Sequence, residues 1–181
     1  MKYQSLINTP IHSMLSYLPT KYNATANQWR TRGLVWDFKA GQHTEYVAKM
    51  IAAEILKHFG CFAANLVFAC IPASNPEANE TRYKDFSAMV CQYTGAENAY
   101  NHIHVNGKRY AVHEHHSGEK ELKQTYVVDF DEEFFNGKKV IVFDDVITSG
   151  NSYVNFSRIL DNFGAEVLSG FFLAKTMEMK N

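Results

Sequence analysis

The stretch Lys139–Asn155, KVIVFDDVITSGNSYVN, carries the clearest structural signal in the chain. Four apolar residues, Val140–Phe143, run without a break into two adjacent carboxylates, Asp144 and Asp145. An uninterrupted apolar run is typical of a strand covered on both faces, as in the middle of a parallel sheet. A polar turn and then a helical pattern follow. In such sheets, ligands bind beyond the carboxyl ends of the strands, where these polar residues would lie.

The turn has the chemistry of a phosphate-binding loop. Thr148, Ser149 and Ser152 offer hydroxyl donors, and Gly150 lets the backbone approach a ligand closely. The helix that follows offers unpaired N–H groups and a positive dipole end to an anion. Adjacent ionised carboxylates repel each other unless a partner holds them, and ribose hydroxyls or Mg²⁺ with its waters are suitable partners.

Lys139–Asn155 closely resembles the phosphoribosyl pyrophosphate signature of the type I phosphoribosyltransferases, an apolar strand followed by two acids and a Thr-Ser-Gly turn. The resemblance implies that Asp144 and Asp145 are the catalytic pair that binds the ribose hydroxyls. It also implies that the next seven residues hold the 5′-phosphate. These are Val146, Ile147, Thr148, Ser149, Gly150, Asn151 and Ser152.

Two other interpretations of this stretch compete with the phosphoribosyl one. One is a buried strand and a polar helix cap that bind no ligand. The other is a Walker B strand, which requires a Gly-rich loop ending in Gly-Lys-Ser/Thr. The sequence has no such loop, because Gly137-Lys138-Lys139 precedes a strand rather than a helix.

Composition indicates a soluble globular protein of one domain, residues 1–181. Hydrophobic residues make up 46% and charged residues 20%, and 18 basic residues balance 19 acidic ones. This balance argues against direct nucleic-acid or membrane-surface binding. No apolar run is long enough to span a bilayer, and Pro10 and Pro19 interrupt the start, which lacks a signal-peptide core. Three cysteines without metal-ligand spacing suit a reducing compartment, so we expect a cytoplasmic protein.

Periodicity predicts a doubly wound α/β fold with a mainly parallel sheet of about five strands. Helical patterns cover residues 41–60 and 85–93, and buried strands cover 66–71 and 166–175. We assign 41–181 to this α/β core. Residues 1–40 are expected to form an irregular, aromatic-rich and variable N-terminal cover. In the family such a region lies over the site and selects the nucleophile, although its aromatic residues could equally be core.

The run Ile71–Phe86 adds to the resemblance. In the family, the loop after the strand that corresponds to residues 66–71 receives pyrophosphate through its backbone amides. Here these would be the amides of Ala73, Ser74 and Asn75. The spacing is nearest to the amidophosphoribosyltransferase-like competence protein F group, in which a basic segment leads to an Arg-Gly-Phe element that opens a helix. Here Arg82-Tyr83-Lys84-Asp85-Phe86 occupies that place without the Gly. Arg82 and Lys84 are therefore candidate pyrophosphate partners, or solvated surface cations.

A hairpin arm is predicted between the two signature strands. Asn106-Gly107, flanked by HIHV and KRYAVH, is the pair favoured in a type I′ turn. The polar run 113–121 then suggests a mobile lid that excludes water from the reactants. Arg109 is the arm residue that we assign to the substrate site, and Lys108 and Lys120 are further candidates.

Histidines in the arm raise the alternative of a metal site. His113, His115 and His116 with Glu114 could ligate Zn²⁺, but they crowd into one polar stretch, and a hydrated loop explains them as well. We assign no metal ligands on the chain. The cysteine zinc module common in competence protein F members is missing, because no Cys precedes Cys61.

The resemblance implies an Mg²⁺-dependent transferase that moves ribose 5-phosphate from phosphoribosyl pyrophosphate to a nitrogen nucleophile and releases pyrophosphate. The alternative is a non-catalytic sensor of phosphoribosyl pyrophosphate, or an accessory protein of competence and DNA uptake. Pyrophosphate release with an acceptor would favour the enzyme, and binding without turnover would favour the sensor. Dimers are common in the family, so a homodimer is open. The sequence does not identify the acceptor.

Overall fold

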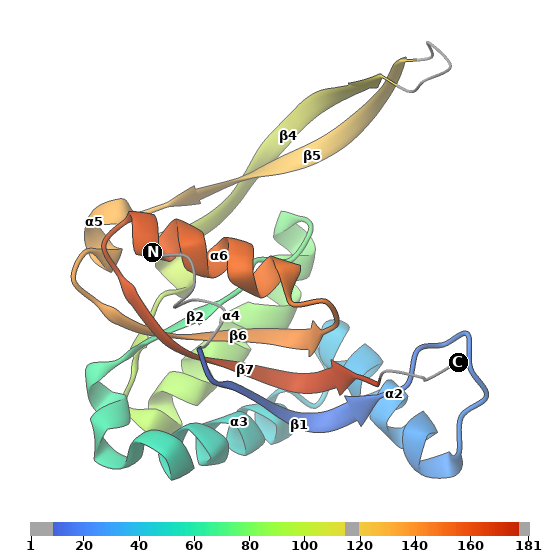
Figure 1. The fold of residues 1–181 in the computed structure, drawn as a ribbon, viewed down its shortest axis with the longest axis horizontal. Helices are drawn as coiled ribbons and strands as arrows, with labels where there is room; N and C mark the ends of the chain where they lie inside the picture. Colours follow the sequence, from blue (N-terminus) through green and yellow to red (C-terminus); the bar gives the residue numbers. More distant parts are fainter. Residues whose placement is uncertain (1–8, 115–119, 178–181) are drawn as a thin grey trace.

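A parallel sheet of five strands forms the centre of the molecule (Figure 1). The computed structural model describes residues 9–114 and 120–177, with all of their side chains except those of 107–114 and 120–126. All neighbouring strands in the sheet are parallel, so their carboxyl ends meet at one edge and the predicted sheet is confirmed. The strands, in the spatial order β1-β7-β6-β2-β3, are β1 (Ile11–Tyr17), β7 (Glu166–Thr176), β6 (Lys139–Ile147), β2 (Val67–Cys70) and β3 (Glu97–Asn98).

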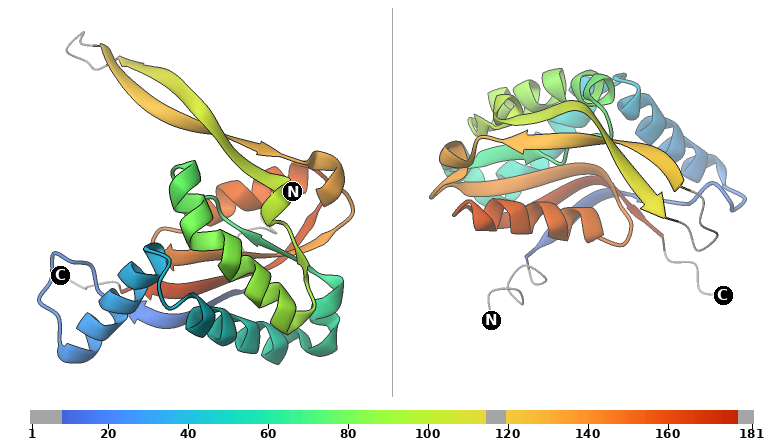
Figure 2. Two further views of the ribbon diagram at one scale, coloured as in Figure 1. Left: turned by 180° about the vertical axis from the view of Figure 1, so that it is seen from behind. Right: turned by 90° about the horizontal axis from the view of Figure 1, so that it is seen from above.

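Helices cover both faces of the sheet, as a doubly wound fold requires (Figure 2). One face carries α2 (Ala26–Lys39), α3 (Thr44–Phe59) and α4 (Pro76–Thr94), and the other carries α5 (Glu132–Phe135) and α6 (Asn151–Asn162). Short 3-10 turns, η1 (Gly60–Asn65) and η2 (Tyr100–His102), link elements at the rim. The two cores differ in their aromatic residues. Phe38, Phe86 and Phe143 meet under α2 and α4, whereas Phe135, Phe156 and Phe172 lie under α5 and α6.

The N-terminal part of the chain is not irregular, contrary to the expectation. β1 joins the sheet as an edge strand beside β7, and Pro10 and Pro19 lie just outside its ends rather than breaking it. α2 begins with a capping box, in which the Thr25 side chain accepts from the Gln28 backbone and the Gln28 side chain accepts from the Thr25 backbone. Arg32 of this helix is buried and donates to three backbone carbonyls of the β1–α2 connection at 2.6–2.8 Å.

The helix predicted over 85–93 begins nine residues earlier. Asn75 is the N-cap of α4 and accepts a hydrogen bond from the Ala78 N–H at 2.8 Å. Pro76 occupies the first helical position, where its missing N–H costs nothing. The turn-forming string at 72–76 is therefore a helix start. As a consequence, the basic segment Arg82–Phe86 lies inside the helix rather than opening one.

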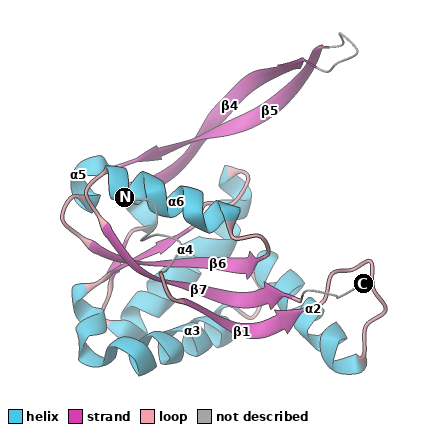
Figure 3. Cartoon of the chain, in the orientation of Figure 1, coloured by secondary structure: helices cyan, strands magenta, loops and turns pink. Residues whose placement is uncertain are grey.

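An antiparallel ribbon projects from the body between β2 and β6 in the chain, which confirms the predicted arm (Figure 3). It consists of β4 (Ile103–Glu114) and β5 (Lys120–Phe130). The turn does not fall at Asn106-Gly107. β4 runs through this pair with a register irregularity, because its residues pair with β5 from Ile103 opposite Phe130 out to Glu114 opposite Lys120. A glycine inside a strand commonly marks such a bulge. The closing residues, 115–119, lie outside the description.

Candidate functional site

Asp144 and Asp145 lie within strand β6, not in the loop after it. Pairing with β7 continues past them, with Asp144 opposite Phe172, Val146 opposite Ala174 and Ile147 opposite Lys175. The strand therefore continues four residues beyond the end of the apolar run Val140–Phe143. The backbone of both carboxylates is consequently fixed by the sheet. Our expectation that they lie beyond the carboxyl end of the strand was wrong.

A pocket of about 110 Å³ opens beyond the carboxyl end of β6. Several waters would fill this volume, so a phosphate group fits. All seven residues of the predicted phosphate loop, Val146–Ser152, line the pocket, and Asp144 lines it as well. Tyr153 and Phe172, which the sequence did not single out, complete the lining. The structure thus brings together the loop that the sequence predicted.

Gly150 gives this loop its shape. Its φ is +79°, in the left-handed region that glycine adopts without strain, and it is the N-cap of α6. A glycine cap has no side-chain oxygen to satisfy the N–H groups of the first helical turn. The Asn151 N–H donates weakly to Ser149 Oγ at 3.4 Å. The other first-turn N–H groups and the helix dipole give this end of the pocket an anion-binding character.

Asp145 is engaged in ion pairs and does not line this pocket. Its Oδ2 lies 2.6 Å from Arg82 Nη1 of α4, and its Oδ1 lies 3.3 Å from Lys39 Nζ at the end of α2. Only 4% of the residue is exposed. Asp145 thus links α2 and α4 to the central strand. Its contact with ribose stays a prediction.

Asp144 presents a carboxylate with unusual protonation chemistry. Its Oδ1 accepts from Tyr83 Oη at 3.1 Å and from the Asp145 N–H at 2.8 Å. Burial and, second, the charge of Asp145 raise the pKa of Asp144 to about 6. Burial also raises the pKa of Tyr83 well above its usual value, so its phenol stays protonated and donates. Asp144 can therefore accept hydroxyl hydrogen bonds or exchange a proton near neutral pH.

The predicted pyrophosphate loop lies beside this strand, because the Ile71 N–H donates to the Phe143 carbonyl at 2.8 Å. Its amides are partly engaged. The Ala73 N–H donates to Asn79 Oδ1 at 3.0 Å, and Asn75 caps α4. Ser74 is exposed, and no hydrogen bond of the described structure engages its side chain or its N–H.

Of the three predicted basic partners of pyrophosphate, the structure describes the side chains of Arg82 and Lys84, and neither lines the pocket beyond β6. Arg82 holds Asp145, as above. Lys84 lies on the exposed surface of α4, 2.6 Å from Glu80 Oε1. Arg109 belongs to β4, but its side chain lies outside the description, as do those of Lys108 and Lys120. The arm cluster His113–His116 lies outside it too.

Besides Tyr153 and Phe172, sequence reasoning missed two residues that contact the carboxylates. Tyr83 lies 61 positions before Asp144, and Lys39 ends a helix in the segment expected to be irregular. The capping box at Thr25 is the signal that could have revealed that helix. No local pattern reports the contacts of Tyr83 and Lys39 with the two carboxylates. Across the described residues, no helix is long and apolar enough to cross a membrane.

The backbone of this chain aligns in part with several solved structures, at low sequence identity. No protein-family model matches the chain, and no curated protein matches it. Among solved structures, adenine phosphoribosyltransferase from Thermoanaerobacter pseudethanolicus aligns over 72% of this chain and 66% of its own, with 16% identity and a TM-score of 0.44. A Neisseria gonorrhoeae protein with bound ppGpp aligns over 93% and 76%, with 13% identity and a TM-score of 0.46.

Purine phosphoribosyltransferase from Pyrococcus horikoshii aligns over 93% of this chain and 97% of its own, with 11% identity and a TM-score of 0.41. The alignment with the adenine enzyme spans slightly less than two thirds of that protein. Similarity at this level concerns the arrangement of the backbone and carries no chemistry. The function must therefore be inferred from the site residues.

Proposed function

We propose that the chain binds phosphoribosyl pyrophosphate and transfers its ribose 5-phosphate to a nitrogen nucleophile. The observation that carries this proposal is the pocket beyond β6, which the whole Val146–Ser152 loop and Asp144 line together. A loop of hydroxyls and a left-handed glycine before a helix suits a phosphate, and an adjacent carboxylate suits a sugar hydroxyl. A phosphorylated sugar satisfies both requirements at once.

In this proposal the 5′-phosphate lies at the start of α6. The first-turn N–H groups donate to it, with the hydroxyls of Thr148, Ser149 and Ser152 beside them. Asp144 accepts hydrogen bonds from the ribose hydroxyls. Tyr83, which donates to Asp144 Oδ1, fixes the orientation of that carboxylate. The pyrophosphate extends toward Ser74 in the loop after β2.

The donor set fits Mg²⁺ through one protein carboxylate. Asp144 lines the pocket, whereas both oxygens of Asp145 are engaged by Lys39 and Arg82. Mg²⁺ commonly keeps several waters and is held by one or two carboxylates together with substrate phosphates, so Asp144 and the pyrophosphate oxygens suffice. When bound, the ion would neutralise charge on the leaving pyrophosphate.

The proposed reaction is a substitution at C1 of the ribose. The lone pair of the nucleophile forms the C1–N bond while the C1–O bond breaks, and the bonding pair leaves with pyrophosphate. The nitrogen then loses its extra proton to water. Positive charge develops on the sugar, as in glycoside chemistry, and Asp144 lies where its charge would stabilise it. Positioning supplies much of the remaining rate.

A competence protein F-like role and a sensor function stay secondary proposals. Homodimer formation and a cytoplasmic location stay predictions.

Calorimetric titration of phosphoribosyl pyrophosphate, with and without Mg²⁺, tests binding. Asp144→Asn should weaken binding roughly 10- to 100-fold, since a hydrogen bond to a charged group contributes about 1.5–3 kcal/mol. Asp85→Asn, on the exposed surface of α4, is the matched control and should bind as wild type does. Equal affinity of wild type and Asp144→Asn would show that the ribose assignment is wrong.

Pyrophosphate release, measured with a panel of purines, pyrimidines and amines, tests turnover. Release that depends on an acceptor and on Asp144 would support the transferase. Binding without release across the panel would leave the sensor as the better proposal.

A further inference from the structure

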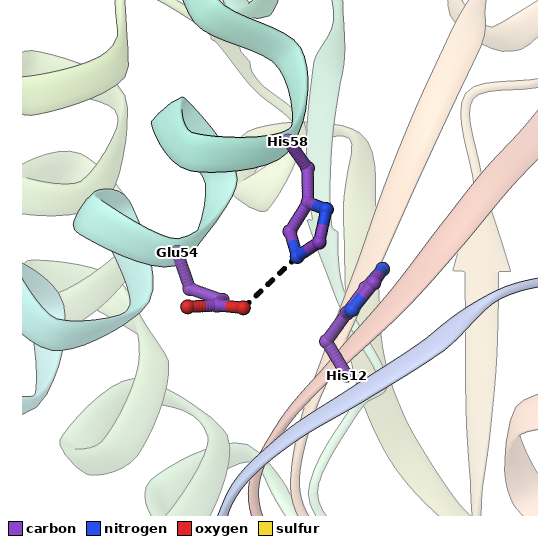
Figure 4. A group of neighbouring side chains, drawn as sticks. All are labelled: His12, Glu54 and His58. Atoms are coloured by element: carbon purple, nitrogen blue, oxygen red, sulfur yellow. Dashed lines mark hydrogen bonds and ion pairs between the residues drawn. The ribbon is translucent and has the colours of Figure 1, made fainter.

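Three potential metal ligands converge between β1 and α3, on the face of the sheet opposite the one that α6 covers (Figure 4). His12 lies near the start of β1, and Glu54 and His58 lie near the end of α3. One ligand atom from each side chain lies within 4.8 Å of the other two. His12 pairs with Phe171, which pairs with Phe143 of β6, so the cluster lies level with the middle of β6. Phe171 belongs to the core under α2, α3 and α4, whereas Tyr153 and Phe172 of the phosphate pocket belong to the core on the other face.

The fold itself holds these side chains in place. Glu54 and His58 are four residues apart and therefore share one face of α3, with His58 Nε2 2.9 Å from Glu54 Oε1. His12 is opposite Phe171 in the β1–β7 register, and its ring stacks on that phenyl ring at 5.0 Å between centroids. The His12 and His58 rings are 3.8 Å apart. All three side chains are partly or fully accessible to solvent.

We propose that His12, Glu54 and His58 form a binding site for a divalent transition metal of the Zn²⁺ type. Two imidazoles and a carboxylate are a common zinc ligand set, and they leave a fourth position for water or another ligand. Metal–ligand bonds of about 2.0–2.2 Å place tetrahedral ligand atoms roughly 3.3–3.6 Å apart. The ligand atoms lie within 4.8 Å of one another, so side-chain shifts on the order of 1 Å bring them to that separation. Mg²⁺ is a poor match, because it prefers oxygen ligands.

The charges around the cluster favour the metal-binding protonation states. Burial, and then His58, lowers the pKa of His12, so its imidazole is neutral at pH 7. Hydrogen bonds from Lys57 and His58 lower the pKa of Glu54, which is ionised. Metal ligands must be deprotonated in this way. Lys57 is the opposing charge, with Nζ 3.0 Å from Glu54 Oε1, but its side chain is 68% exposed and can turn into solvent.

The same three side chains could instead form a hydrogen-bonded contact that needs no ion, and this alternative predicts no metal uptake. A bound metal would join the edge strand β1 to α3, two elements 42 residues apart, counted from His12 to Glu54. Because the ligands come from both elements, metal binding should stabilise the folded chain against heat.

The test is a titration of the full chain with Zn²⁺, followed by calorimetry, and with Co²⁺, followed by its visible absorption. His12→Phe keeps a ring to stack on Phe171 but removes the ligand nitrogen, and Glu54→Gln keeps the shape of the side chain. Either variant should lose one bound equivalent, the Co²⁺ absorption of a low-coordinate site and the Zn²⁺-induced rise in Tm.

Two controls identify where the metal binds. His43→Gln, an exposed histidine at the other end of α3, should keep the wild-type stoichiometry. The triple variant H113Q/H115Q/H116Q removes the histidines of the 113–116 cluster and should keep the equivalent that His12→Phe loses. The proposal is overturned if wild type takes up no Zn²⁺, or if His12→Phe and Glu54→Gln bind as wild type does. Loss of that equivalent only in the triple variant would overturn it as well.

Discussion

Replacing Asp144 with Asn should make the folded protein more stable while it weakens ligand binding. The folded chain holds the Asp144 proton more tightly than the unfolded chain, since burial and the neighbouring Asp145 raise its pKa from 3.8 to about 6. Ionising Asp144 therefore costs stability. The cost is absent below pH 3.8, grows as the pH rises and is complete above about pH 6. Asn is neutral at every pH, and its Oδ1 can still accept from Tyr83 Oη and the Asp145 N–H.

The magnitude follows from the size of the pKa shift. A shift of about two units corresponds to about 3 kcal/mol at pH 7.5, at 1.36 kcal/mol per unit. At pH 4.5 most of the folded protein has Asp144 protonated, so the cost is about 1 kcal/mol. The gain of Asp144→Asn should therefore shrink by about 2 kcal/mol between these pH values. At pH 7.5 the gain raises Tm by roughly 5–10 °C in a chain of this size.

Urea unfolding followed by circular dichroism at pH 7.5 and pH 4.5 measures both quantities. Asp85→Asn, an exposed carboxylate on α4, should change stability by less than about 0.5 kcal/mol at either pH. If Asp144→Asn is no more stable than wild type at pH 7.5, ionisation of Asp144 does not destabilise the folded protein and the reasoning fails. A gain that is the same at both pH values would equally refute it, because a packing effect does not follow the titration.

Three further substitutions test other parts of the structure. Asp145→Asn should destabilise the fold by about 3 kcal/mol in urea titrations, because it leaves Arg82 and Lys39 without their shared anion. Adding Arg82→Gln to that variant should recover part of the lost stability. Gly150→Val should cost about 1–2 kcal/mol for its left-handed backbone, and it should abolish calorimetric phosphoribosyl pyrophosphate binding in chains that remain folded. Arg32→Met should lower stability by roughly 3 kcal/mol, measured as a fall in Tm, since one buried and two partly buried carbonyls lose their donor.

Asp145→Asn also shows why the two carboxylates should be replaced one at a time. A double Asp144/Asp145 substitution is not a neutral way to remove binding, because the two carboxylates have opposite effects on stability. Wild-type stability of Asp145→Asn would show that the ion pairs contribute little.

The sequence by itself determined the features that rest on local signals. The apolar run Val140–Phe143 identified the central strand, and the hydroxyl- and glycine-rich turn identified the loop that lines the pocket. Both depend on neighbouring residues only, because strand burial and turn conformation are written into consecutive side chains. The spacing of strands and helices likewise predicted the doubly wound sheet.

Only the tertiary structure decided the features that depend on a distant partner. β1 is a strand because β7 offers it an edge, and nothing within Ile11–Tyr17 provides that partner. Asn106-Gly107 has the local preference of a turn, yet pairing with β5 along the whole arm overrides it. The two aspartates are adjacent in sequence but differ in role, because Arg82 and Lys39 reach Asp145 whereas Asp144 lines the pocket. Such contacts join residues 63 positions apart, and local patterns carry no record of them.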